Sequence, residues 1–493
     1  MNILGSRPFY ILLPLMVLTG CAVSPTPFAE EESRKILDAD RTLAVKDMVP
    51  ITGPLTLEEA IARALKYNLE HRTRLLQQAL ASDQLEAGKF DMLPRLMANA
   101  GYSSRDNDAT RKTLNPTTGT VSDVGYVSAD RAHSTGDISV LWNALDFGAS
   151  YYTSKQNADQ LLIASERRRK AMHTLIQNVR TAYWRAQAAE QLSGQLREAI
   201  HQGESALADA QKVTTERVKN PTESLRYRRL LLENLRLMEG VERELASARI
   251  ELINLIGAKP GSMITLARGD MIPPPLSMSM EVMEEMALMK NADLRESFYN
   301  ARIVAAETRK SILKMLPGIT LDYGSKWDND SYLINQQWRE AGVRVSFNLF
   351  NILSGPSRLK AAERNENVEA ARRMALQMSV LTQVHLAGHQ YGDALRQYQR
   401  ADAIFLVDGE MAQIVQSQQQ SNMASQMDKI SANVTYILSA VRRFQAIAKV
   451  HEAASRVQAT LGLEPEIASL DETDLPTLQA SIKQSLQQWQ TAK

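Results

Sequence analysis

The chain has 493 residues, and its 57 lysines and arginines almost balance its 56 aspartates and glutamates, which leaves a formal net charge of +1. This balance provides no basic field for nucleic acid, so no nucleic-acid partner is expected. The single cysteine excludes an internal disulfide and a cysteine zinc site. Neither a Gly-x-x-x-x-Gly-Lys-Ser/Thr loop nor a Gly-x-Ser-x-Gly elbow occurs, so we predict no enzyme activity and no cofactor.

Residues 1–20 are predicted to be a bacterial export signal. Arg7 precedes an apolar run of about 13 residues, which is too short for a membrane helix of about 20 residues. The run ends in Leu18-Thr19-Gly20-Cys21, which resembles the signal of bacterial lipoproteins. That resemblance implies lipidation of Cys21 and sorting to the outer membrane, with residues 21–54 as an extended tether behind the lipid anchor.

One structural plan occurs twice. Residues 255–257 (Leu-Ile-Gly) correspond to residues 460–462 (Thr-Leu-Gly), and residues 89–94 correspond to residues 311–317, each ending in Leu-Pro. This separation is far longer than the period of a solenoid repeat and indicates a duplicated half. Each half is predicted to contain a helix, a strand, a loop, a strand and then two long helices.

The duplication sets the predicted boundaries. The first repeat spans residues 55–258 and the second spans residues 280–463. Residues 259–279 form a linker whose run of three prolines no helix interior tolerates. Residues 464–493 form a C-terminal tail.

Very long helices are the main predicted elements. No proline occurs from Thr117 to Asn220 or from Ser357 to Glu464, and both stretches are rich in helix-forming residues. A helix from Ala149 to about Lys219 would be on the order of 100 Å long. Its apolar positions form broad, mixed stripes, which are typical of helices packed on both sides in a wall.

Alternating residues predict four strands, near residues 95–104, 137–147, 318–327 and 342–350. In the last of them four apolar residues alternate with three polar ones: Val343, Val345, Phe347 and Leu349 with Arg344, Ser346 and Asn348. This pattern predicts a lipid-facing side and a lumen-facing side. Four strands cannot close a membrane barrel, whose smallest size is about eight strands, so the chain must oligomerise as a dimer or a trimer.

The sequence from about Leu55 to Leu463 resembles the TolC-like family of outer-membrane factors. The resemblance rests on the opening of each half, such as Leu55-Thr56-Leu57-Glu58-Glu59-Ala60, and on the strand-to-helix corner at residues 141–148. It implies a mainly α fold with a small membrane β-barrel: a homotrimer with twelve strands and a long α-helical tunnel. It also implies docking to a periplasmic adaptor (membrane fusion protein) and to an inner-membrane ABC or proton-driven transporter.

The resemblance places the tunnel's periplasmic tip at the turns between the long helices. The first turn is expected at Lys219, Asn220 and Pro221. In the second, Asn422 replaces the family's glycine, and asparagine tolerates positive φ better than other side chains. The acidic position that follows is Asp428, a candidate for the periplasmic gate, with a solvated helix carboxylate as the alternative. The candidates for adaptor contact near the tip are Arg226, Arg228 and Arg229.

Two other features have simpler interpretations. His385 and His389 stand one helical turn apart without an evident third ligand, so we predict no metal site. Residues 166–170 (Glu-Arg-Arg-Arg-Lys) are interpreted as a solvated helix face, with adaptor contact as the alternative. The predicted function is a lipid-anchored outer-membrane channel subunit of an efflux or type I secretion system. The alternative is a lipid-anchored periplasmic coiled-coil adaptor or scaffold, which needs no lipid-facing strands.

Overall fold

The computed structural model describes residues 25–215, 221–267, 278–421, 423, 426–463 and 474–491, so the predicted signal and Cys21 lie outside it. The chain divides into two units, residues 1–50 and 51–493. The first contains helix α1 (Glu30–Val45), none of whose residues is buried. Its first turn is acidic, and Arg34 and Lys35 pair with Glu30 and Glu31 one turn away. These interactions favour a helix where we had predicted an extended tether.

The second unit contains the duplicated plan. The elements of the first repeat are α2 (Leu57–Tyr67), α3 (Leu69–Phe90), β1 (Arg95–Ser104), β4 (Ala132–Asn143), α4 (Ala144–Thr215) and α5 (Pro221–Leu255). Those of the second are α6 (Met280–Lys290), α7 (Ala292–Leu313), β5 (Gly318–Asp328), β6 (Gln337–Ser346), α8 (Phe350–Gln420) and α9 (Gln426–Leu461). The additional elements are β2 (Thr110–Arg111), β3 (Tyr126–Val127) and α10 (Leu475–Thr491). No helix among the described residues is long and apolar enough to cross a membrane.

The two repeats end in the same way. Gly257 and Gly462 have φ values of 72° and 67°, the left-handed conformation that ends many helices. A Cβ on Gly257 would lie 2.7 Å from the carbonyl oxygen of Tyr67, and one on Gly462 would lie 2.4 Å from that of Lys290. Both positions therefore require glycine, because of φ and because of space.

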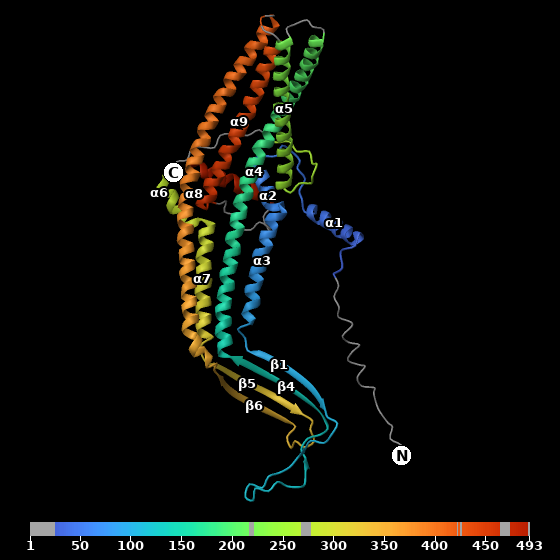
Figure 1. Ribbon diagram of the computed structural model, residues 1–493, viewed down its shortest axis with the longest axis vertical. Helices are drawn as coiled ribbons and strands as arrows, with labels where there is room; N and C mark the ends of the chain where they lie inside the picture. Colours follow the sequence, from blue (N-terminus) through green and yellow to red (C-terminus); the bar gives the residue numbers. More distant parts are fainter. Residues whose placement is uncertain are drawn as a thin grey trace. The chain divides into compact units, whose positions relative to one another are not determined.

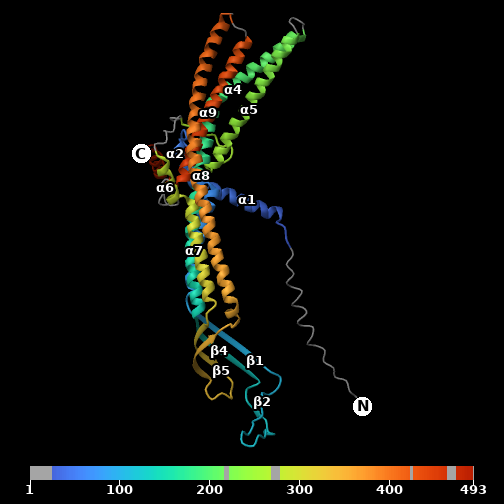
Figure 2. The same cartoon turned by 60° about the vertical axis from the view of Figure 1, so that its left-hand side comes forward.

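The strands form one antiparallel sheet in the order β1-β4-β5-β6, which leaves β1 and β6 at its two edges. Helices α3, α4, α7 and α8 continue from these strands and pack in the same order (Figure 1). Farther from the sheet the neighbours are α5, α4, α9 and α8. In Figure 2 the α4–α5 pair diverges from the α8–α9 pair toward the ends far from the sheet.

Two strands differ from their predicted boundaries. We predicted strands at residues 137–147 and 342–350, but β4 ends at Asn143 and β6 ends at Ser346. The Oδ1 of Asn143 accepts the N–H groups of residues 145 and 146, and α4 begins at Ala144 instead of residue 149. The Oδ1 of Asn348 accepts the N–H of Phe350, where α8 begins. The cap at Asn143 ends β4 early, and the turn that Asn348 forms before α8 places residues 347–349 in the connection.

The core lies where α4 meets α2 and α9, at mid-height of the long helices. Tyr183 of α4 is buried there, and its hydroxyl lies within hydrogen-bond distance of two carbonyl oxygens that its single proton can reach, at 3.1 Å from Leu55 and 2.9 Å from Ala267. Burial raises the pKa of this hydroxyl well above its usual range. Ile264 and Leu266 are also buried, so the start of the predicted linker belongs to the core, whereas residues 268–277 lie outside the described part.

Candidate functional site

The sheet has one predominantly apolar face. In its register Leu321 of β5 lies opposite Val343 of β6 and opposite Trp142 of β4, while Ile319 lies opposite Val345. Residues directly opposite each other share a face, so these side chains form one surface. Val343 is 72% exposed and Val345 is 67% exposed. A large exposed apolar surface of this kind marks contact with another protein or with lipid.

The other face of the sheet is mainly polar. Asn99 of β1 donates to Asp137 of β4 at 3.1 Å, and Lys326 of β5 pairs with Glu340 of β6 at 2.7 Å. Arg344 lies opposite residue 320 on this face, and Ser346 lies opposite residue 318. The alternation predicted for β6 is therefore present up to Ser346. The remaining residues of the predicted set, Phe347, Asn348 and Leu349, lie beyond the strand.

The dimensions of the sheet fit a bilayer. Its four strands have 10 to 12 residues, and a tilted strand of about 9–11 residues crosses a membrane. Aromatic residues stand at both ends of the apolar face. Trp142 contacts Phe147 near the helices, with ring centroids 6.0 Å apart, and Tyr102 and Trp327 are exposed near the loops. Aromatic residues in these positions are typical of membrane interfaces.

At the far end of the sheet, an ion pair lies within the loop of the first repeat, and hydrogen bonds join that loop to the loop of the second repeat. Arg131 binds Asp108 through two hydrogen bonds of 2.6 and 3.0 Å. Asp130 accepts from the backbone N–H and the hydroxyl of Ser331 at 2.6 and 2.9 Å, which holds the pKa of its carboxyl below the usual value. The N–H of Asp130 in turn donates to Asp330 at 3.1 Å. The hairpin loop of the first repeat is thereby attached to the loop of the second.

The predicted tip residues belong to the turns and helix starts between the long helices, at the end far from the sheet. Lys219, Asn220 and Asn422 lie outside the described residues, and Pro221 is the first residue of α5, a position that proline favours. Asp428 is exposed in the first turn of α9. A carboxylate there also stabilises the helix through its dipole, so this placement agrees with both interpretations of Asp428.

The three candidate arginines occupy one stretch of α5. Arg226 is exposed, and Arg229 pairs with Glu233 at 3.1 Å on the same helix. The Nε of Arg228 is buried and has no hydrogen-bond partner among the described residues. Arg228 and Arg229 line a shallow groove together with Leu225, Leu232, Glu233 and Arg236. This surface is basic and partly apolar, and it is open in the single chain.

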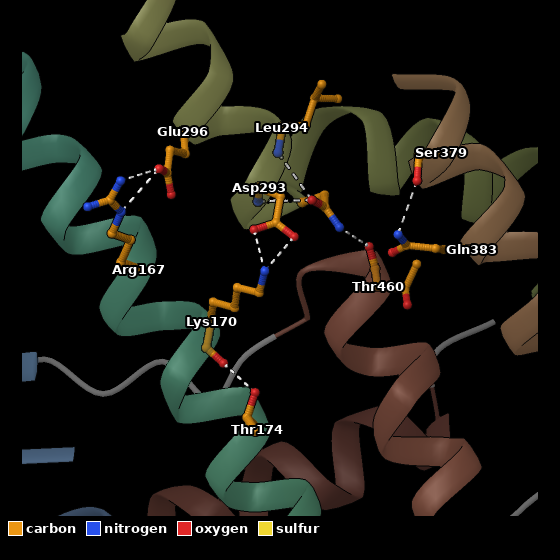
Figure 3. Close-up of polar contacts among 10 residues, drawn as sticks. Arg167, Lys170, Thr174, Asp293, Leu294, Glu296, Ser379, Gln383 and Thr460 are labelled. Carbon is orange, nitrogen blue, oxygen red and sulfur yellow. Dashed lines mark hydrogen bonds and ion pairs between the residues drawn. The ribbon is translucent and has the colours of Figure 1, made fainter. Parts of the chain in front are cut away.

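Residues 166–170 are only partly the solvated face that we predicted: Arg167 and Lys170 are exposed, whereas Glu166 is buried, and all three contact α7. Arg167 pairs with Glu296 of α7 at 2.7 Å, and Lys170 pairs with Asp293 at 2.8 Å (Figure 3). Glu166 is buried and binds Arg295 of α7 at 2.9 Å. The charges are complementary across two helices, which a sequence alone does not show. These ion pairs are part of the contact between α4 of the first repeat and α7 of the second.

The two histidines of α8 contact different carboxylates. His385 Nε2 lies 2.6 Å from Glu284 of α6, and His389 Nδ1 lies 2.9 Å from Asp393 of α8. No group of three histidines, cysteines or acidic residues suited to a metal occurs in the described part of the chain. The structure thus gives each imidazole a local partner.

Arg180 is among the buried charges that were missed from the sequence. Arg180 of α4 is 5% exposed and donates from Nη1 to Ser455 and Gln458 of α9 at 2.7 and 3.0 Å. Desolvation lowers the pKa of Arg180 to about 10. No carboxylate pairs with it in the described residues. An arginine in an amphipathic helix gives no signal of burial, because burial depends on which helix packs against it.

Among the comparisons with known proteins, the one with solved structures bears on the fold. No protein-family model matches the sequence, and no curated protein matches it. Among solved structures, the chain is similar to the Campylobacter jejuni CmeC outer-membrane channel, with a TM-score of 0.64, 15% identity and coverage of 87% of this chain and 89% of that one. It is also similar to the open state of the Neisseria gonorrhoeae MtrE outer-membrane channel, with a TM-score of 0.64, 16% identity and coverage of 82% and 88%. The Vibrio cholerae outer-membrane protein VceC gives a TM-score of 0.60 at 11% identity, with coverage of 82% and 96%.

Proposed function

We propose that this chain, which has the fold of the TolC-like outer-membrane channels, is one subunit of a passive conduit across the outer membrane. The observation that carries the proposal is the four-stranded sheet. It has an apolar face, a polar face and two edges at which no strand of the described chain pairs. An unpaired edge is prohibitively costly in lipid, so the sheet must be completed by other copies.

Three copies would give a closed barrel of twelve strands. The apolar face with Val343 and Val345 would then contact lipid, and the polar face with Arg344 and Ser346 would line the lumen. Helices α4 and α8 have 72 and 71 residues, each about 107 Å long at 1.5 Å per residue. Helices of this length, carried by every copy, would continue the barrel as a long tunnel into the periplasm.

The proposed partners follow from Cys21 and from the groove on α5. Cys21 would carry a lipid and anchor the chain in the outer membrane. The basic and apolar groove of α5 near Arg228 and Arg229 would contact a periplasmic adaptor. No motif for nucleotide hydrolysis occurs in the sequence, so energy would come from an inner-membrane ABC or proton-driven transporter.

The decisive experiment is native mass spectrometry of the protein extracted from membranes, combined with conductance in planar bilayers. We expect three chains per particle and stable single-channel steps. A monomer with full helical content and no conductance would refute the channel and favour the alternative, a lipid-anchored adaptor or scaffold. The alternating exposed faces of β5 and β6 argue against that alternative, because an adaptor needs no such surface.

Lipidation requires its own measurement. Intact mass of the membrane-extracted protein should show a mature chain that begins at Cys21 and carries acyl groups. Cys21→Ala should lose the acyl mass and keep the conductance, because a twelve-stranded barrel holds itself in the bilayer. If the membrane-extracted protein keeps residues 1–20 and carries no acyl groups, lipidation of Cys21 is contradicted and the channel proposal still stands.

A further inference from the structure

The corner at which the first repeat passes from helix to sheet contains a pocket. It lies where α3 ends and α4 begins, beside the adjoining ends of β1 and β4 (Figure 1), and it has a volume of about 380 Å³. Pockets that hold small molecules have volumes of about 300–1,000 Å³. The corner pocket is therefore large enough for the polar group of a ligand and the carbon atoms next to it.

Charges of both signs line the corner pocket. Asp91 follows α3, Arg95 is the first residue of β1, and Asp146 lies in the first turn of α4. None of these three side chains forms a hydrogen bond or an ion pair within the described part of the chain. Two carboxylates and one guanidinium around the same space suit a ligand that carries a cation and an anion a few atoms apart.

The corner pocket also has apolar walls. Phe90 and Leu93 line it beside α3, and Trp142 and Phe147 line it beside α4. Phe90 is 73% exposed and Phe147 is 43% exposed. Trp142 belongs to the apolar face of the sheet, where it lies opposite Leu321. The pocket is thus continuous with that face, and exposed apolar side chains beside charges suit an amphipathic ligand.

The second repeat closes the corresponding corner with its own side chains. Counting from Asn143 and Asn348, Asp146 corresponds to Asn351, whose Nδ2 donates to the carbonyl oxygen of Lys314 at 3.1 Å. An ionised carboxylate has no hydrogen to donate, so Asp146 cannot make this bond in the first repeat. Because the second corner folds with an amide, the fold itself does not require a carboxylate at this position.

Two further differences separate the corners. Counted from the proline that precedes each strand, Arg95 corresponds to Gly318, so the base of the first corner has no side-chain counterpart in the second. Ser150 lines the corner pocket, whereas its counterpart Gly355 lies against Met315, whose sulfur would be 3.1 Å from an added Cβ. The combination of two acids, one base and open space therefore needs a cause other than the fold.

Under the proposed function the corner pocket lies at a membrane surface. The sheet crosses the bilayer and the helices continue into the periplasm, so the corner is at the level of the headgroups in the periplasmic leaflet. The rings of Trp142 and Phe147, with centroids 6.0 Å apart, are typical of that level. Phospholipids are the amphipathic molecules that a protein meets there.

We propose that the corner pocket of each copy binds one phospholipid with a primary ammonium, a phosphatidylethanolamine. This inference rests on the proposed function and adds a lipid partner to it. Asp91 and Asp146 would bind the ammonium, Arg95 would bind the phosphate, and the acyl chains would pass Trp142 onto the apolar face of the sheet.

The same chemistry disfavours two other phospholipids. Phosphatidylglycerol carries the phosphate without a cation, so the two carboxylates would repel it. Phosphatidylcholine carries a quaternary cation that has no N–H to donate to them. The pocket should therefore prefer phosphatidylethanolamine to both.

Native mass spectrometry of the protein from nanodiscs with equal amounts of these three phospholipids tests the proposal. On release into detergent, the parent trimer should retain up to three phospholipids, mainly phosphatidylethanolamine. Arg95→Gln should lower the retained phosphatidylethanolamine by about tenfold, because it removes the charge-assisted hydrogen bonds to the phosphate. Asp91→Asn/Asp146→Asn should shift the preference toward phosphatidylglycerol, because Arg95 remains and the repelling charges are gone.

Two further variants control for folding and for charge in general. Lys314→Gln removes an exposed charge at the second corner and should leave the lipid preference unchanged. Arg95→Lys keeps the positive charge and should retain more phosphatidylethanolamine than Arg95→Gln does. Thermal unfolding followed by circular dichroism shows which variants keep the stability of the parent. A role of Asp91 or Asp146 in folding alone would change the melting temperature without changing the lipid preference, and that result would overturn the proposal.

The outcomes distinguish this inference from the proposed function. Trimers that retain the three phospholipids in equal amounts, or retain none, would overturn the lipid site and leave the channel proposal standing. The latter result is expected if a neighbouring copy fills the corner pocket. An unchanged preference in Asp91→Asn/Asp146→Asn would also overturn the lipid site. Monomers in mass spectrometry of the parent protein would overturn the channel proposal itself.

Discussion

Asn291 joins the beginning and the end of the second repeat: its Nδ2 donates to the carbonyl oxygen of Thr460 at 3.1 Å. Its Oδ1 accepts the N–H groups of Asp293 and Leu294 and so caps α7. Asn68 makes the corresponding bond to the carbonyl oxygen of Leu255 at 3.2 Å in the first repeat. Each asparagine therefore couples a helix start to the end of a helix that lies far away in the sequence.

Substitutions at Asn291 separate these two roles. Asn291→Asp keeps the acceptor for the helix cap and loses the donor to Thr460, so we expect it to destabilise the fold by about 1–3 kcal/mol. Asn291→Ala loses the cap as well and should cost roughly 1 kcal/mol more. Thermal unfolding followed by circular dichroism in detergent provides the measurement. An Asn291→Asp protein that melts like the parent would show that the bond to Thr460 contributes nothing.

Arg180→Met is expected to stabilise the protein. The lowered pKa of about 10 means that burial disfavours the charged guanidinium by about 3 kcal/mol relative to the unfolded chain. An apolar side chain of similar length removes that cost, although Ser455 and Gln458 lose a donor, so we expect a net gain of about 1–2 kcal/mol. The control Arg185→Met removes a partly exposed pair with Glu251 and should change stability by less than about 1 kcal/mol.

The lowered pKa of Arg180 also determines how the cost of burying this residue changes with pH. Above a pH of about 10 and up to the ordinary, higher pKa of an arginine in the unfolded chain, the unfolded chain binds the proton more tightly than the folded chain does. The cost of burying Arg180 is therefore fully present below pH 10 and fades above it. A loss of stability in Arg180→Met at pH 8 would mean that the hydrogen bonds to α9 outweigh the desolvation of the charge.

Arginine substitutions on opposite faces of the sheet test the assignment of lipid and lumen. Val343→Arg places a charge on the apolar face and should cost about 2–4 kcal/mol per subunit if the site lies near the membrane midplane. Met97→Arg makes a similar chemical change on the polar face, where Met97 lies opposite Ser139. We expect Val343→Arg to reduce the amount of assembled protein in the outer membrane, and Met97→Arg to assemble normally with altered conductance. Equal assembly of both variants would contradict the assignment.

Asp428→Ala tests the proposed gate. We propose that Asp428 helps to hold a narrow entrance shut and that three such carboxylates attract cations there. Their removal should loosen the constriction and raise single-channel conductance, and it should weaken block by divalent cations because the cation-attracting charge is lost, with little change in assembly. Glu410→Ala serves as the control, because it removes an exposed carboxylate of α8 that lies outside the predicted tip turn. If conductance and divalent block stay unchanged in Asp428→Ala, the carboxylate serves α9 alone as a favourable residue near the helix start.

The fold and the elements of the sheet could be predicted from the sequence because their causes are local. Alternation in β5 and β6 depends on the two-residue period of a strand, and the long helices depend on composition and the absence of proline. The duplication was visible because Gly257 and Gly462 occupy positions that only glycine fits. The strand ends were predicted less well, since Asn143 caps α4 and Asn348 forms a turn before α8, both inside an alternating pattern.

Only the tertiary structure decided which helices face each other. The charged run at residues 166–170 has the composition of a solvated surface, and its role as a contact to Asp293 and Glu296 depends on the position of α7. Arg180 is buried because α9 covers it, and no neighbouring residue in the sequence signals that burial. Periodicity along one chain segment determines which face is apolar, whereas the identity of the partner depends on contacts between segments more than a hundred residues apart.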